Sequence, residues 1–109
     1  MLKNITKNKL ISKEIVFKKG FGKIFGLIGR KEPEVIILNT RFGIHTFFLK
    51  FPIDVLILDK KNRVKGLKKG LKPRRIMFWN FRYNIVVELP QGLIKKSETK
   101  LGDLLEFDL

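Results

Sequence analysis

The sequence predicts a mainly β domain of the α+β class: an antiparallel β-sandwich or partly closed barrel of five to seven strands with one or two short helices. Its 109 residues suit a single domain spanning residues 1–109, and 44% of them are hydrophobic, which is enough for one core. Short apolar segments recur between turn residues, without the alternating helices that a parallel sheet needs. Residues 53–58 are apolar on both faces, as expected for a central strand that is covered twice.

The first third of the chain combines an extended segment with a helical pattern. Residues 8–18 mix apolar side chains with lysines and predict a strand or ribbon. Within residues 20–30 the apolar residues recur at i, i+3, i+4 and i+7, which predicts a helix with one apolar face. Internal glycines weaken such a helix by about 1 kcal/mol each relative to alanine, so we expect it to pack as a lid over the domain. Its apolar face comprises Phe21, Ile24, Phe25 and Ile28.

Two apolar segments lead to the strongest strand signal. Residues 35–38 predict a short strand, residues 39–43 a turn, and residues 44–49 a second apolar segment. Pro52 lacks the amide hydrogen that a sheet ladder needs, so it predicts a bend before residues 53–58. One face of that strand carries Ile53, Val55 and Ile57, and the other carries Leu56 and Leu58.

A hairpin follows this strand. The polar residues 59–62 predict a turn, and residues 63–67 are the expected hairpin partner. Residues 68–72 are rich in lysine and contain a glycine, so they are predicted to form a basic loop.

The C-terminal part predicts two strands and a short helix. Apolar residues at odd positions predict a strand over residues 83–89 with its odd-numbered side chains facing inward. Residues 91–97 predict a short helix that buries Leu93 and Ile94, and residues 104–109 predict a closing strand.

Charge and composition limit the function classes. The chain carries 24 basic and 10 acidic residues, a net charge of +14, so it should attract polyanions without specificity. There is no cysteine and only one histidine, which excludes disulfides, thiolate metal sites and a multi-histidine metal site within one chain. We therefore expect no metal and no cofactor.

Hydropathy predicts no membrane span. The longest apolar runs have four residues, far below the roughly 18 that a membrane-spanning helix needs. The N-terminal segment lacks the apolar stretch of a secretory signal, so a cytoplasmic location is the default expectation. Edge strands in so small a sheet make a homodimer a further expectation.

Four ordered motifs resemble one family. Residues 43–55 read GIHTFFLKFPIDV and resemble the GIHTFFMRFPIDV core of the domain-of-unknown-function 192 family. Three further segments resemble motifs of this family and occur in the same order along the chain. They resemble its GL-x-x-R segment at residues 26–30 (GLIGR), its LELPAG motif at residues 88–92 (ELPQG) and its GD turn at residues 101–103 (LGD). The resemblance implies a β-rich fold. It implies no established biochemical activity and offers no catalytic residues to transfer to this chain.

Asp54 is the most conspicuous polar residue, because it lies in the most apolar strand. A buried carboxylate is costly unless it is hydrogen-bonded or paired. It could accept backbone N–H groups at the bend after Pro52, form an ion pair with Arg41 or Arg74, or pair with His45 as a general base. An enzyme using this last pair is one hypothesis, but no residue in a nucleophile motif accompanies it.

The main hypothesis is a non-enzymatic binding module. Polar and aromatic residues gather around residues 43–54 of an otherwise apolar scaffold, which suggests a cleft for a small polar ligand or a peptide. The expected rim residues are Arg41, His45, Asp54 and Trp79.

The alternative hypothesis is single-stranded nucleic-acid binding. Residues 74–83 interleave basic and aromatic side chains, and aromatic rings stack bases with about 1–3 kcal/mol each. The competing interpretation is a strand whose aromatic side chains fill the core, which the odd positions of Phe81 and Tyr83 favour. The candidate residues for nucleic acid are Arg74, Arg75, Phe78, Trp79 and Arg82.

Overall fold

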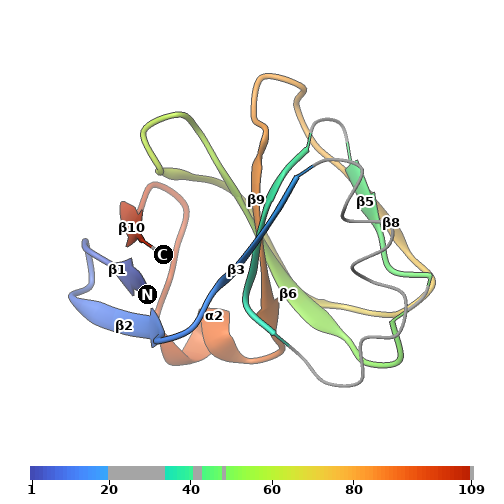
Figure 1. Ribbon diagram of the computed structural model, residues 1–109, viewed down its shortest axis with the longest axis horizontal. Helices are drawn as coiled ribbons and strands as arrows, with labels where there is room; N and C mark the ends of the chain where they lie inside the picture. The colour runs from blue at the N-terminus through green and yellow to red at the C-terminus, as the bar shows by residue number, and fades with distance from the viewer. Residues whose placement is uncertain (20–33, 41–42, 48, 109) are drawn as a thin grey trace.

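The computed structural model describes residues 1–19, 34–40, 43–47 and 49–108 (Figure 1). The helix predicted within residues 20–30 lies outside the described residues. The described residues form ten strands in three sheets and one short helix. The strands are β1 (Leu2–Asn4), β2 (Lys9–Ser12), β3 (Val16–Lys19), β4 (Ile36–Asn39), β5 (Gly43–His45), β6 (Ile53–Leu58), β7 (Val64–Leu71), β8 (Ile76–Phe78), β9 (Ile85–Pro90) and β10 (Leu105–Phe107), and the helix is α2 (Leu93–Lys96).

Three layers of strands build the domain. The middle layer is a five-stranded sheet of order β3-β4-β9-β6-β7, in which β3 and β4 are parallel and all other neighbours are antiparallel. A three-stranded sheet of order β10-β1-β2 covers one face, and the two-stranded β5–β8 sheet covers the other (Figure 1). The predicted mainly β, sandwich-like class is confirmed, without a closed barrel. No helix in the described part of the chain is long and apolar enough to cross a membrane.

Strand β6 is covered on both faces, as the sequence predicts. All six of its side chains are buried, because β7 and β9 flank it and a layer lies above and below it. Leu56 and Leu58 pack into the core shared with the three-stranded sheet and α2. Ile53, Val55 and Ile57 pack into the core beneath β5 and β8. Each fully buried aliphatic side chain contributes about 1.5–3 kcal/mol of transfer free energy, so this strand holds the layers together.

The prediction of a basic loop at residues 68–72 is wrong, because β7 continues to Leu71. Ladder hydrogen bonds to β6 extend this strand through a stretch that is poor in strand-forming residues. Its exposed residues include Lys65, Lys68 and Lys69. Since β7 is an edge strand, these charges oppose pairing of the edge with another chain.

The prediction that only the odd-numbered side chains of residues 83–89 face inward does not hold for β9. It lies between β4 and β6, so even-numbered Val86 and Glu88 are buried along with odd-numbered Val87 and Leu89. Alternation in sequence indicates a solvent face only where one side of the sheet is open, and both sides are covered here.

The two ends of the chain meet in the three-stranded sheet. Strand β1, which the sequence analysis did not predict, pairs with both β2 and β10. The closing strand predicted within residues 104–109 is present as β10, and the helix predicted within residues 91–97 is present as α2, with Ile94 fully buried. The strand and the helix are confirmed, but Leu93, which was predicted to be buried, is half-buried.

A buried carboxylate connects this sheet to its neighbouring turns. Asp103 accepts hydrogen bonds from Asn4 Nδ2 (3.0 Å), Lys7 Nζ (2.9 Å) and the backbone N–H of Lys100 (3.0 Å). Burial raises the pKa of Asp103, but these hydrogen bonds lower it by a larger amount. The net pKa therefore lies below the ordinary value of an aspartate.

Candidate functional site

Asp54 is a buried carboxylate that joins three elements. It is 1% exposed, and its Oδ1 accepts the backbone N–H of Gly70 on β7 at 2.9 Å. Its Oδ2 accepts the backbone N–H groups of Gly92 and Ile94 at the start of α2, each at 3.0 Å. These contacts agree with the interpretation of Asp54 as an acceptor of backbone amides. The donors lie on β7 and α2, however, and not at the bend after Pro52.

His45 lies on β5, opposite Ile76 of β8. Its ring stacks on the ring of Phe47, with the centroids 5.2 Å apart and the planes inclined by 29°. Among the hydrogen bonds between described residues, none joins His45 to Asp54, and no ion pair joins Asp54 to Arg74. The hydrogen bonds that Asp54 accepts from described residues thus come from backbone amides, and the general-base pair stays a prediction.

The side chain of Trp79 is partly buried and connects the loop after β8 to the core. Its ring packs against the core beneath β5 and β8, and its Nε1 donates a hydrogen bond to the backbone oxygen of Tyr83 at 2.7 Å. Arg41 lies outside the described residues. The predicted rim of Arg41, His45, Asp54 and Trp79 thus stays a prediction, and two of its members hold structural hydrogen bonds.

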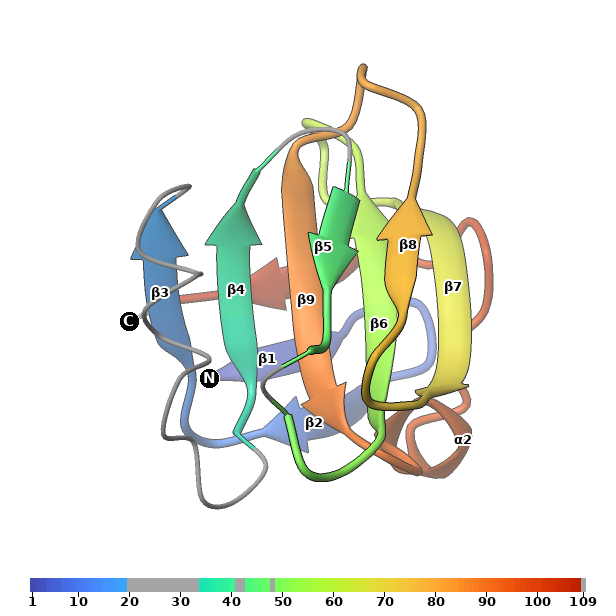
Figure 2. The same cartoon turned by 90° about the vertical axis from the view of Figure 1, so that its right-hand side faces the viewer.

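The β5–β8 sheet brings together the two regions that the sequence analysis treated as alternatives. Gly43 pairs with Phe78, Ile44 with Met77 and His45 with Ile76. Ile44 and Met77 point into the core, so the intervening positions point outward. Figure 2 shows this two-stranded ribbon in front of β9 and β6.

The outward side of this ribbon carries three exposed apolar side chains. We call it the ribbon face, and define it as Gly43, His45, Phe47, Ile76 and Phe78. Phe78 is 74% exposed, Ile76 53% and Phe47 50%. Phe81, in the loop after β8, is 60% exposed. The interpretation that the aromatic side chains of residues 74–83 fill the core is therefore wrong for Phe78 and Phe81. Among the described strands, the ribbon is the outermost layer on this side.

A close approach holds the ring of Phe78 against β5. A β-carbon at Gly43 would lie 2.6 Å from the backbone oxygen of Met77 and 2.9 Å from Cδ1 of Phe78. Both distances are shorter than real contacts, so the ring occupies the space that a side chain at residue 43 would need. The glycine therefore lets Phe78 lie along the ribbon.

Two arginines are placed beside the ribbon face by a buried threonine. Thr46 Oγ1 donates to the backbone oxygen of Lys72 at 2.7 Å and accepts the backbone N–H of Arg75 at 2.9 Å. The backbone N–H of Thr46 donates to the oxygen of Arg75, also at 2.9 Å. These bonds fix the turn that carries Arg74 and Arg75, both of which are exposed, immediately before Ile76. Arg74 has a φ of 61°, a left-handed conformation that the fixed turn imposes.

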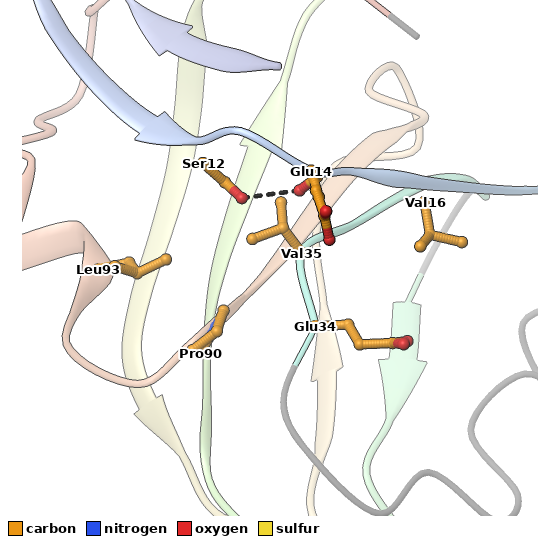
Figure 3. A pocket seen from close by; sticks show the side chains of 7 residues that line it. All are labelled: Ser12, Glu14, Val16, Glu34, Val35, Pro90 and Leu93. Atoms are coloured by element: carbon orange, nitrogen blue, oxygen red, sulfur yellow. Dashed lines mark hydrogen bonds between the residues drawn. The ribbon is translucent and has the colours of Figure 1, made fainter.

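A separate cavity of about 300 Å³ lies between the β2–β3 connection, the segment before β4 and the end of β9 (Figure 3). Its wall includes the exposed side chains of Glu14 and Glu34 above apolar residues. Ser12 Oγ donates a hydrogen bond to the backbone oxygen of Glu14 at 2.7 Å. No residue of the ribbon face lines this cavity. Among the described residues, no group of three His, Asp or Glu side chains could hold a metal ion.

Comparison with known proteins places the chain in a family. The model of the DUF192 family, described as "Uncharacterized ACR", matches residues 8–107. The chain therefore belongs to the DUF192 family, as the four sequence motifs predict.

Similar proteins cover nearly the whole chain. The UPF0127 protein PF1050 of Pyrococcus furiosus is 36% identical in an alignment of 112 positions, gaps included, that covers 96% of each chain. The UPF0127 protein PH1112 of Pyrococcus horikoshii is 32% identical in an alignment of 114 positions, gaps included, that covers 98% of each chain. A solved structure of a protein of unknown function from Novosphingobium aromaticivorans has the same fold, with a TM-score of 0.71 and 19% identity over 86% of this chain and 73% of that one.

Proposed function

We propose that this protein is a non-enzymatic binding module whose ribbon face binds single-stranded nucleic acid. The observation that carries the proposal is the exposure of Ile76 and Phe78 on β8 and of Phe47 just after β5, with the exposed Arg74 and Arg75 directly before β8. A cluster of exposed apolar side chains with a polar border is typical of an interaction surface.

Both components of single-strand binding are present at this face. Exposed aromatic rings offer flat surfaces on which bases stack, and each stacked base contributes about 1–3 kcal/mol. Arg74 and Arg75 offer guanidinium groups that bind phosphate with paired hydrogen bonds. The protein's net charge of +14 draws the strand to the surface before these contacts form.

The segment around residues 43–54 contributes to the same surface. Gly43, His45 and Phe47 come from it, while Ile76 and Phe78 come from residues 74–83. The hypothesis of a small polar ligand or peptide near residues 43–54 shares only the rim residue His45 with this face. We favour a nucleic acid because exposed aromatic rings occur on this face and two exposed arginines precede β8 directly. In addition, Asp54 is committed to three backbone amides.

Fluorescence anisotropy with a labelled single-stranded RNA or DNA of about 12 nucleotides tests the proposal. Binding should be measurable at low salt and should weaken with a slope of about −0.7 in log K against log salt for each phosphate contacted. Phe78→Ala should weaken binding about fivefold or more. The matched control is Leu101→Ala, which removes an equally exposed apolar side chain from another part of the surface.

The contribution of the arginines needs a charge-matched control. The double variant Arg74→Gly/Arg75→Ala should reduce the magnitude of the salt slope by about 1.4, since two phosphate contacts are lost. Lys13→Ala/Lys95→Ala removes the same charge from exposed positions outside the face and should leave most of the slope intact. Undetectable binding at low salt, or equal losses from both double variants, would overturn the ribbon face as the binding site.

A further inference from the structure

A second basic and aromatic site lies at one end of the molecule. The β6–β7 turn and the β8–β9 loop project from the same end in both views (Figure 1 and Figure 2). Between them is a cleft of about 490 Å³, which is within the range of small-molecule sites. None of its lining residues belongs to the ribbon face. The cleft is lined by Asp59, Lys60, Lys61, Phe81, Arg82 and Tyr83.

The β6–β7 side of the cleft is held by hydrogen bonds within the turn. Asp59 Oδ1 accepts the backbone N–H groups of Lys61 and Arg63, each at 2.9 Å. The backbone N–H of Asn62 donates to the oxygen of Asp59 at 3.0 Å. Asp59 is thus occupied in shaping the turn, and the turn presents the exposed side chains of Lys60 and Lys61.

The β8–β9 side is held in a similar way. Asn80 Oδ1 accepts the backbone N–H of Arg82 at 3.0 Å, and the backbone oxygen of Asn80 accepts the N–H of Tyr83 at 3.0 Å. Trp79 Nε1 donates to the oxygen of Tyr83 at 2.7 Å, which ties the loop to the core. These bonds hold the backbone of this wall in place, and the exposed side chains of Phe81 and Arg82 extend from it. Preformed walls lower the ordering cost of binding.

We infer that this cleft binds a nucleoside 5′-phosphate. Lys60, Lys61 and Arg82 supply three positive charges against the single carboxylate of Asp59, which favours an anion of more than one charge. Phe81 supplies an exposed aromatic surface for a flat base, so the cleft can recognise both halves of the ligand. A phosphate without a base would leave Phe81 uncovered, and a nucleoside without phosphate would leave the cations unpaired.

Isothermal titration calorimetry with AMP, adenosine and inorganic phosphate tests this inference. AMP should bind, and adenosine and phosphate should each bind at least tenfold more weakly. Lys60→Ala/Lys61→Ala should weaken AMP binding at least tenfold, and Phe81→Ala should weaken it about fivefold. Lys68→Ala/Lys69→Ala, which removes the same charge from exposed positions of β7 outside the cleft, should leave the affinity within twofold.

Three results would overturn the inference: adenosine or phosphate binding as tightly as AMP, no AMP binding at low salt, or an equal loss in the β7 control. The cleft and the ribbon face are separable, because Phe78→Ala should leave AMP binding unchanged. A comparison of two oligonucleotides identifies the source of the ligand. If an oligonucleotide with a 5′-phosphate binds more tightly than the same oligonucleotide with a 5′-hydroxyl, the natural ligand is the end of a strand. If the two bind equally and AMP also binds, the natural ligand is a free nucleotide.

Discussion

Replacing Asp54 tests whether one buried carboxylate joins β6, β7 and the start of α2. Its two oxygens accept three backbone N–H groups at 2.9–3.0 Å, from Gly70, Gly92 and Ile94. Asp54→Ala removes both acceptor oxygens and with them all three hydrogen bonds. Ile94 is fully buried, so water cannot replace the lost acceptor of its amide. Gly92 is exposed and Gly70 is half-buried, so their amides regain some hydration.

The expected loss follows from this difference in water access. An unsatisfied buried amide costs about 1–3 kcal/mol, and we take about 2 kcal/mol for Ile94 and about 1 kcal/mol for each glycine. Asp54→Ala should therefore lower the free energy of unfolding by about 4 kcal/mol. Asp54→Asn keeps one oxygen for the helix amides but turns its NH₂ group toward Gly70, so it should lose about 2 kcal/mol.

Urea unfolding followed by far-ultraviolet circular dichroism measures these losses. With a slope of about 1.5 kcal/mol per M, Asp54→Ala should lower the unfolding midpoint by about 2.5 M. Asp108→Ala is the control, because it removes an exposed carboxylate whose ion pair with the N-terminus should contribute at most about 1 kcal/mol. An Asp54→Ala loss below about 1 kcal/mol, or equal losses for the two Asp54 variants, would refute the proposed role of these hydrogen bonds.

Three further predictions concern the core, the ribbon and acid stability. Leu56→Ala should cost about 3 kcal/mol in urea unfolding because the side chain is fully buried, while the exposed Leu101→Ala should change stability by less than about 0.5 kcal/mol. Gly43→Ala should cost about 1–3 kcal/mol, since its new carbon would meet the backbone oxygen of Met77; an unchanged melting temperature would contradict the close approach. Burial raises and hydrogen bonds lower the pKa of Asp103, with a net value below the ordinary one, so its contribution is present above about pH 4 and is lost as the pH falls through the folded-state value. Asp103→Asn should thus show a smaller drop in the urea midpoint between about pH 7 and pH 3 than the unmodified protein does, and equal drops would contradict this.

Local composition was sufficient to predict the elements whose environment follows from their own side chains. Residues 53–58 carry apolar side chains at successive positions on both faces, and such a segment is stable only when both faces are covered. The segment around Leu93 and Ile94 follows Pro90 and Gly92, which end the preceding strand and allow a turn into a helix. These predictions needed no knowledge of the partner elements.

The environments of the aromatic residues could not be predicted in this way. Alternation places Phe81 and Tyr83 on one side of an extended segment, but it does not say whether that side meets another layer. Phe78 and Phe81 are exposed because nothing in the described structure packs over β8 and its following loop. Val86 is buried because a core lies on each side of β9.

Composition and local pattern were enough to predict the β-rich class, the doubly covered strand at 53–58, the family and the surplus of positive charge, because each depends on residue content or on neighbours along the chain. Three-dimensional packing was needed to show that residues 43–45 and 76–78 pair into one exposed face, and that the amides bound by Asp54 come from β7 and α2. Pairing between segments some 30 residues apart is selected by the packing of the whole domain, since many registers are compatible with the local sequence and only one buries Ile44 and Met77.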